Sequence, residues 1–167
     1  MKNKKDFYLL LDNIRSIFNV GAIFRTADAA GIDKIFLGGI TCLSNKQGKK
    51  KELNIKINKT ALGAEKTIDW EHTWQSWRMV EKLKKQGFQI IALEQTKKSF
   101  NYTKFKPKFP LVLIVGNEKN GVSKNLLKRC DKIIALPMHG QKESLNVAVA
   151  AGIAIYEINK YRFRIYN

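Results

Sequence analysis

Short runs of wholly apolar residues, separated by longer amphipathic stretches, constrain the fold of this chain more than any other feature. Because the runs are apolar on both faces, they are typical of strands in a buried parallel sheet. We expect strands at residues 7–11, 34–37, 88–93, 111–115 and 132–136, and helices at residues 20–30, 73–85, 124–130 and 145–161. Gly31 and Gly87 stand where a glycine commonly ends a helix. This alternation predicts an α/β fold, with a mostly parallel sheet and helices on both faces.

Size and composition indicate one globular domain. The chain has 167 residues, of which 44% are hydrophobic, enough to form a core. Because it contains neither an internal repeat nor a linker rich in proline or serine, we expect a single domain over residues 1–167. In parallel α/β sheets, ligands bind beyond the carboxyl ends of the strands. A site is therefore expected in the loops that follow the strands.

The sequence predicts neither a membrane protein nor a metal site. Its longest apolar-rich stretch, residues 145–156, is too short to cross a bilayer. The apolar run at residues 7–11 follows lysines but lacks the small-residue cleavage site of a signal peptide. Cys42 and Cys130 are isolated, and no cysteines or histidines have the spacing of zinc ligands. We expect a cytoplasmic protein with no bound metal.

The charge of the chain points to a polyanionic partner. Lysine and arginine number 31 against 14 aspartates and glutamates, which gives a formal net charge of +17. Nucleic acid is the expected partner, and charge that serves only solubility is the alternative. Residues 41–60 are rich in lysine and predict a loop. Residues 97–108 interleave lysines with Phe100, Tyr102 and Phe105, which indicates either contacts with bases and phosphates or an ordinary sheet edge.

Three strand-to-helix connections carry the remaining chemical signals. The chain has no dinucleotide-binding glycine motif, no phosphate-binding P-loop and no serine-nucleophile elbow. In the first connection, Asn19 is a candidate N-cap residue. Arg25 follows six residues later in a largely apolar helix. There its guanidinium group would either bind an anion or reach the solvent while the apolar part of the side chain packs on the protein.

The other two connections follow the fourth and fifth predicted strands. Gly116 and Gly121 flank a polar loop, which suits either a close approach of the backbone to a ligand or a solvated turn. In that loop, Glu118 would accept hydrogen bonds from a ligand or hold an arginine. In the third connection, Ser144 is a candidate N-cap for a helix rich in alanine and glycine, and the amino end of such a helix suits an anion.

Taken together, the three connections resemble the SpoU (TrmH-like) family of the SPOUT methyltransferase superfamily. The motifs NVGAIFRTADAAG, VGNEKNGVS and LPMHGQKESLNVAVAAGIAIYE occur in the family's order and spacing, KTALGAEK is a further match, and the resemblance spans residues 6–160. It implies transfer of a methyl group from S-adenosyl-L-methionine to a ribose 2′-hydroxyl of tRNA or rRNA. It also implies a deep trefoil knot in the C-terminal part of the sheet and a homodimer with active sites at the subunit interface.

The resemblance further implies roles for individual residues. The family's catalytic positions are occupied by Asn19, Arg25, Glu118, Ser144 and Asn146, and its cofactor-binding positions by Leu93, Glu94, Gly116, Asn117, Leu136, Met138, Ser144 and Leu145. Arg25 is the key residue, either as the base that takes the hydroxyl proton or as a clamp that holds the neighbouring phosphate and stabilises the developing alkoxide. The asparagines would orient the ribose or Arg25, Glu118 would support them, and Ser144 would cap the helix.

Two alternative functions stay open. The chain would be either a catalytically silent RNA-binding protein on the same scaffold or a base methyltransferase of the related knotted TrmD-like branch. The complete set of catalytic positions argues against the first, and the first and third motifs favour ribose over base. We also expect residues 144–157 to lie near the dimer interface, because alanine and glycine allow close packing. The same small residues would also suit packing of this helix onto its own sheet.

Overall fold

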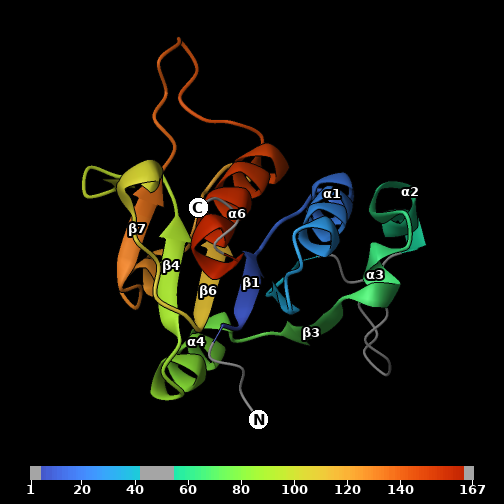
Figure 1. Ribbon diagram of the computed structural model, residues 1–167. Helices are drawn as coiled ribbons and strands as arrows, with labels where there is room; N and C mark the ends of the chain where they lie inside the picture. The colour runs from blue at the N-terminus through green and yellow to red at the C-terminus, as the bar shows by residue number, and fades with distance from the viewer. Residues whose placement is uncertain (1–4, 42–54, 164–167) are drawn as a thin grey trace.

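The computed structural model describes residues 5–41 and 55–163 (Figure 1). Within these residues, seven parallel strands form one sheet in the order β3-β2-β1-β6-β4-β7-β5. The predicted α/β class is thus confirmed. The strands are β1 (Phe7–Asp12), β2 (Lys34–Gly38), β3 (Asp69–Thr73), β4 (Gln89–Leu93), β5 (Phe100–Asn101), β6 (Leu111–Val115) and β7 (Lys132–Ala135).

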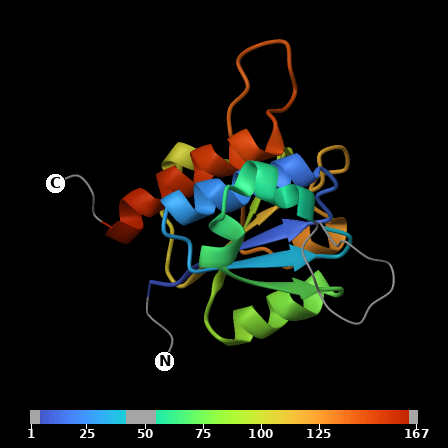
Figure 2. The ribbon, with the colours of Figure 1, turned by 90° about the vertical axis from the view of Figure 1, so that its right-hand side faces the viewer.

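Helices cover both faces of the sheet, as predicted (Figure 2). Gly31 and Gly87 follow the first and the fourth helix with φ angles of +67° and +87°, which confirms their predicted place at helix ends. One face carries α1 (Ile17–Ala29), α2 (Asn58–Ala61), α3 (Ala64–Thr67) and α6 (Val147–Phe163), and the other carries α4 (Ser76–Lys85) and α5 (Lys124–Leu127); the 3₁₀ helices are η1 (Ile55–Ile57) and η2 (Tyr102–Lys104).

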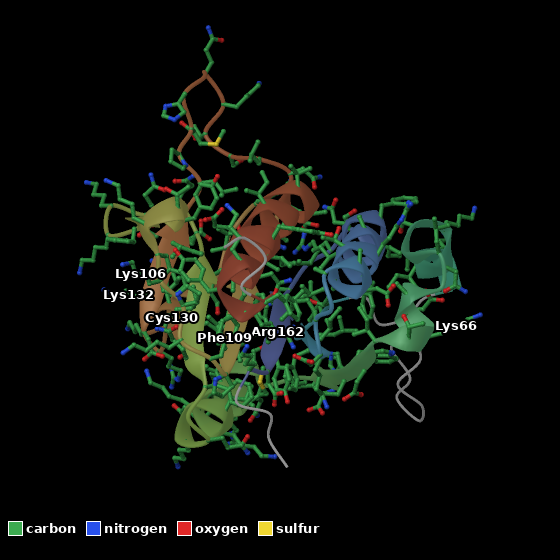
Figure 3. All side chains as sticks on the ribbon, viewed as in Figure 1. Lys66, Lys106, Phe109, Cys130, Lys132 and Arg162 are labelled. Atoms are coloured by element: carbon green, nitrogen blue, oxygen red, sulfur yellow. The ribbon has the colours of Figure 1, made fainter. Side chains whose placement is uncertain are left out.

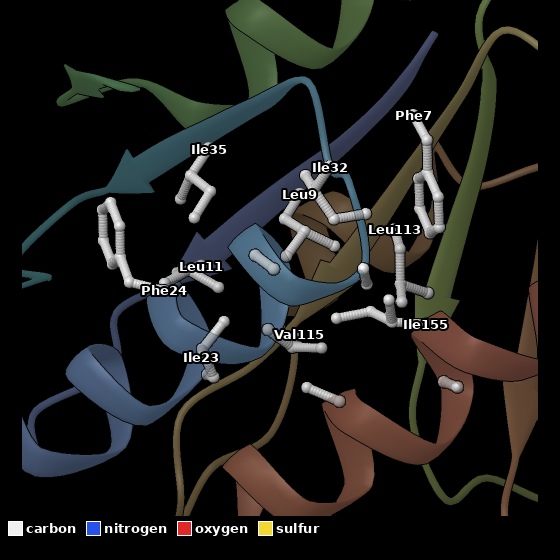
Figure 4. Close-up of a cluster of buried hydrophobic side chains, with 14 of the residues drawn as sticks. Phe7, Leu9, Leu11, Ile23, Phe24, Ile32, Ile35, Leu113, Val115 and Ile155 are labelled. Carbon is white, nitrogen blue, oxygen red and sulfur yellow. The ribbon is translucent and has the colours of Figure 1, made fainter. Parts of the chain in front are cut away.

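The central strands are apolar on both faces because each face is covered by its own hydrophobic core. Along β1, Leu9 and Leu11 point into the core under α1 and α6, whereas Leu10 points into the core under α4. Figure 4 shows the first of these cores, in which Leu113 of β6 meets Ile155 of α6. Burial of each such side chain contributes about 1.5–3 kcal/mol. The sheet is therefore a rigid base for the loops at its carboxyl edge.

Two strands at the edges of the sheet were not predicted. β3 has the polar sequence DWEHT and lies at one edge, where Asp69 and Glu71 form ion pairs with Lys34 of β2 at 3.0 and 2.9 Å. The predicted helix at residues 73–85 was therefore too long, since α4 begins at Ser76. β5 contains only two residues at the other edge, too few to give a recognisable pattern.

The predicted loop at residues 41–60 was wrong in its last part. Residues 42–54 lie outside the described residues, but η1 and α2 follow and pack against α1. Gly21 of α1 allows this approach, because a Cβ atom there would lie 1.9 Å from the Thr60 side-chain oxygen. Among the described residues, none of the helices combines the length and the apolar character needed to cross a membrane.

Candidate active site

A cleft of 440 Å³ lies at the carboxyl ends of β4, β6 and β7, which are neighbours in the sheet. Because parallel strands end at the same edge, the loops that follow these three strands converge there. Ten of the predicted site residues line this cleft: Leu93, Glu94, Gly116, Asn117, Glu118, Leu136, Met138, Ser144, Leu145 and Asn146. All eight residues assigned to the cofactor by resemblance are among them.

The loop after β6 is folded tightly against the end of β4. Asn117 and Gly121 form an antiparallel bridge, and Gly121 has a φ of +66°. A Cβ atom on Gly116 would lie 2.2 Å from the backbone nitrogen of Val122, so only glycine allows this approach. The Glu94 carboxylate accepts hydrogen bonds from the backbone N–H of Val122 at 2.7 Å and of Gln95 at 2.8 Å. These contacts fix one wall of the cleft.

Glu118 is the centre of a polar network at the mouth of the cleft. Its carboxylate accepts a hydrogen bond from the Asn19 side-chain amide at 3.0 Å and others from the backbone N–H groups of Ser16 and Arg15 at 3.1 and 3.2 Å. Partial burial opposes ionisation, but these hydrogen bonds outweigh it and lower the pKa of Glu118 below its ordinary value. Glu118 is therefore a carboxylate that holds the amino end of α1.

Asn19 connects Glu118 to Asn146. The Asn146 side-chain amide donates to the Asn19 side-chain oxygen at 3.0 Å, although 127 positions separate the two residues. The Asn146 side-chain oxygen accepts from the backbone N–H groups of Ala148 at 2.9 Å and Val149 at 3.4 Å. The network thus joins α1, the loop after β6 and the amino end of α6. Both asparagine side chains are held in a single orientation.

The two predicted helix caps were wrong, and the network explains why. Ser16 caps α1, because its side chain accepts from the backbone N–H of Asn19 at 3.3 Å. Asn19 lies in the first turn, where its side chain is available to Glu118. Asn146, and not Ser144, caps α6, and Ser144 is exposed at the cleft. Serine and asparagine are both common N-cap residues, so local sequence alone does not choose between them.

Of the predicted site residues, Asn19 does not line the cleft but belongs to the polar network, whereas Arg25 lies outside both. It is exposed on α1, does not line the cleft, and forms no hydrogen bond or ion pair with a described residue. Six residues of helix separate it from Asn19, which corresponds to about 9 Å along the axis and about 240° around it. The two side chains consequently leave the helix in different directions. A role for Arg25 stays a prediction.

The charge of the cleft differs from that of the whole protein. Its lining contains three glutamates, Glu94, Glu118 and Glu143, and one lysine, Lys119, whereas the chain carries a net charge of +17. Such a lining favours a ligand with positive charge. Among the described residues, no three histidine, cysteine, aspartate or glutamate side chains are grouped so that they could hold a metal ion.

Comparison with known proteins identifies the family. Residues 6–156 match the SpoU rRNA Methylase family. The chain belongs to this family. It is 35% identical over 161 residues to the tRNA (guanosine(18)-2′-O)-methyltransferase of Aquifex aeolicus. The aligned region covers 96% of this chain and 72% of that protein. It is 32% identical over 154 residues to the 23S rRNA (guanosine-2′-O-)-methyltransferase RlmB of Pseudomonas aeruginosa, covering 92% of this chain and 58% of that protein.

Solved structures of SpoU-type enzymes have the same fold. The A. aeolicus TrmH/SpoU tRNA modifying enzyme superposes with a TM-score of 0.82 at 35% identity, covering 98% of this chain and 78% of that one. The AdoMet-bound rRNA methyltransferase from Sinorhizobium meliloti superposes with a TM-score of 0.82 at 26% identity, covering 99% of this chain and 59% of that one. The SpoU family and fold are therefore shown, and several relatives have segments beyond the region that matches this chain.

Proposed function

We propose that this protein transfers a methyl group from S-adenosyl-L-methionine to a ribose 2′-hydroxyl of tRNA or rRNA. The observation that carries the proposal is the hydrogen-bonded chain Glu118–Asn19–Asn146 at the mouth of a cleft, in a member of the SpoU family. The relatives named above act on tRNA and rRNA, and the net charge of +17 suits an RNA substrate. We expect the enzyme to act in the cytoplasm.

The cleft fits the proposed cofactor. A volume of 440 Å³ lies within the range of small-molecule sites, about 300–1,000 Å³. Leu93, Leu136 and Leu145 supply apolar walls that suit the adenine ring, and the glutamates offset the positive charge of the sulfonium and amino groups. When bound, the cofactor supplies an electrophilic methyl group on a positively charged sulfur. The loops after β4, β6 and β7 would hold it, which is also where the family's trefoil knot is predicted.

The asparagine network leaves hydrogen-bond donors free for the RNA. A side-chain amide carries two N–H groups. Asn19 donates one of its N–H groups to Glu118, and Asn146 donates one of its N–H groups to Asn19. Each asparagine therefore has a second N–H group without a partner among the described residues. We infer that these two donors orient the ribose oxygens. Because both asparagines are already fixed by the network, little further ordering is needed when the RNA binds.

Arg25 is proposed to act as a clamp and not as a base. A guanidinium group stays protonated in proteins, so it is a poor acceptor for the proton of a 2′-hydroxyl. The same group binds a phosphate through two parallel hydrogen bonds and stabilises an alkoxide as it forms. The exposed side chain of Arg25 has no carboxylate partner among the described residues, which leaves it free for this role. The proton of the 2′-hydroxyl therefore passes to water at the open mouth of the cleft.

We further propose a homodimer formed by α1 and α6. Val149, Ile153 and Tyr156 are exposed and follow one another at helical spacing on α6, and Phe18 of α1 is also exposed, at 60%. We call Val149, Ile153 and Tyr156 the stripe of α6. The small residues Ala151 and Ala154 are buried in the core of their own chain, so the stripe, and not the small residues, supports the dimer. A dimer through this face would put Arg25 near the subunit boundary.

Two measurements test the proposed function. Isothermal titration calorimetry should detect binding of S-adenosyl-L-methionine or its demethylated product. Transfer of a tritiated methyl group to RNA from cells that lack the gene should yield a 2′-O-methylated nucleoside after complete digestion. Protein without measurable cofactor binding at millimolar ligand would instead be a silent RNA-binding protein. A methylated base in the digest would assign the chain to base methylation.

A further inference from the structure

A long segment beside the cleft contains lysines but no acidic residues. Between Glu94 and Glu118 the chain has no aspartate or glutamate. This segment includes β5, the edge strand next to β7, and runs on through η2. We call the following residues the β5 edge: Lys97, Lys98, Lys104, Lys106 and Lys108 of this segment, its Phe100, and Lys132 of the adjacent strand β7.

The lysines of the β5 edge are exposed and unpaired. None of the six forms an ion pair with a described residue. Elsewhere Lys34, Lys84 and Lys160 are each paired with a carboxylate. Figure 3 shows Lys106 and Lys132 on the same flank of the molecule, at the opposite end from Lys66. Positive charge is thus concentrated on this flank without the carboxylates that offset it in other parts of the fold.

Phe100 gives the β5 edge an aromatic surface. Its side chain is 44% exposed, and the Lys132 ammonium lies 6.0 Å from the centre of its ring. The other aromatic residues of the segment are not available in this way, because Phe105 is buried in the core and both Tyr102 and Phe109 pack against it. Of the two alternatives for this stretch, contact with a base is thus excluded for Phe105, whose ring is buried. An exposed ring among lysines is typical of surfaces on which single-stranded nucleic acid stacks.

The β5 edge begins at the rim of the cleft. Gln95 lines the cleft, and its side-chain amide donates to the backbone oxygen of Leu136 at 2.5 Å. Phe100 pairs with Ile134 of β7, two residues before Leu136, which corresponds to about 7 Å along the strand. An RNA strand whose target ribose lies at the cleft can therefore continue directly over the β5 edge.

We propose that the β5 edge binds the RNA that flanks the target nucleotide, with the lysines on phosphates and Phe100 stacked on an unpaired base. This inference rests on the proposed function, since it takes RNA as the substrate. The competing explanation is that lysines at an edge strand only prevent pairing between sheets of different molecules. That explanation requires no contact with RNA, so the two make different predictions for binding.

A pair of charge-matched variants tests the proposal. The edge variant is Lys98→Gln, Lys106→Gln and Lys132→Gln, and the control is Lys59→Gln, Lys66→Gln and Lys85→Gln, which are exposed on α2, α3 and α4. Binding of fluorescently labelled bulk tRNA is measured over a series of salt concentrations. The edge variant should reduce the slope of log K against log salt by about 2–3, because each phosphate contact contributes about 0.7–0.9. The control should keep a slope close to that of the unchanged protein.

Phe100→Ala separates stacking from charge. It should weaken binding to single-stranded RNA about tenfold and leave the salt slope unchanged. Equal salt slopes for the edge and control variants would overturn the proposal, and so would an edge variant that loses binding to anionic lipid vesicles but not to RNA. Cofactor binding and methyl transfer by the unchanged protein are measured in parallel. If those fail, the proposed function is wrong; if they succeed and the edge variant behaves like the control, only this inference is wrong.

Discussion

The cleft and the β5 edge lie next to each other but are built in opposite ways. In the cleft, Glu94, Glu118 and Asn146 are held by hydrogen bonds with lengths of 2.7–3.4 Å, mostly to backbone groups. At the β5 edge, the lysine side chains have no ion-pair partners among the described residues. The cleft is acidic within a strongly basic protein, and the segment between Glu94 and Glu118 that forms most of the edge is basic and contains no acidic residue.

This difference suits the cleft to catalysis and the β5 edge to the binding of RNA. Chemistry at one atom needs groups whose positions are fixed before the substrate arrives, because ordering them later would cost free energy. Attraction of a long polyanion needs charge but little geometry, since phosphate contacts act over several ångströms and release counterions. Changes in the cleft should therefore alter turnover or cofactor affinity. Changes at the edge should alter RNA affinity and its dependence on salt.

Arg25→Ala should cause the largest loss of methyl-transfer rate. It tests whether Arg25 acts together with the cleft in catalysis. Loss of one positioned donor typically lowers the rate about 100- to 1,000-fold. Arg25→Lys should recover little, because an ammonium group does not reproduce the planar, two-pronged grip on a phosphate. The measurement is single-turnover methyl transfer at saturating RNA, with a melting curve for each variant. Near-normal turnover in Arg25→Ala would mean that this exposed residue is only part of the helix surface.

Ile153→Glu should separate the cleft from the subunit interface. A charge in the exposed stripe of α6 should give a monomer by light scattering and lower turnover at least about tenfold, because a buried unpaired charge costs several kcal/mol. Cofactor affinity should change little, since Ile153 does not line the cleft. The matched control is Leu62→Glu on the loop after α2, which is 64% exposed. A monomer with normal turnover would contradict the proposed dimer.

Gly116→Ala should damage the cleft and spare the β5 edge. The added Cβ atom would collide with the backbone of Val122, which must move the wall that Glu94 holds in place. We expect cofactor affinity to fall about tenfold and stability to fall by about 1–3 kcal/mol. The control is Gly140→Ala, where a Cβ atom meets nothing within 4 Å. The salt slope of RNA binding should be the same in both variants, and a change in Gly116→Ala alone would show that the two regions are coupled.

Sequence patterns predicted the centre of the fold better than its edges. β1, β4 and β6 are covered on both faces, so their burial leaves an unbroken apolar run that is easy to recognise. β3 is an edge strand with polar residues held by ion pairs to Lys34, and nothing in its own sequence indicates a strand. β5 is too short for any periodicity. These elements depend on their neighbours in space, which local patterns do not report.

The site was predictable in composition but not in its connections. The sequence places Asn19, Glu118 and Asn146 in three separate connections, and the resemblance gives each a role. The resemblance does not show that Asn19 bridges the other two residues. That bridge depends on two hydrogen bonds, one to a residue 99 positions away and one to a residue 127 positions away. The helix caps are Ser16 and Asn146 in place of the predicted Asn19 and Ser144. Serine and asparagine cap helices about equally well, so the local sequence does not choose between them.

Glu118→Gln should give the smallest effect and tests how the network is held. Since hydrogen bonding lowers the pKa of Glu118, its carboxylate stabilises the fold at pH values above the ordinary glutamate pKa of about 4.3. This stabilisation is lost as the pH falls through the lowered pKa of the folded state. A glutamine does not titrate, and its side-chain NH2 group would face one of the N–H donors from which the carboxylate now accepts a hydrogen bond. The loss of that hydrogen bond should lower the free energy of unfolding by about 1–2 kcal/mol at neutral pH.

The difference in unfolding free energy between the unchanged protein and Glu118→Gln should therefore be largest at neutral pH and shrink as the pH falls below about 4. Urea unfolding at several pH values measures it. Glu143→Gln is the matched control, because Glu143 also lines the cleft but accepts no hydrogen bond from a described residue. It should show no pH-dependent difference. A constant difference for Glu118→Gln across this range would mean that the network depends on packing and not on the charge of the carboxylate. The cleft would then differ from the β5 edge in the fixed positions of its groups and not in the use of a hydrogen-bonded charge.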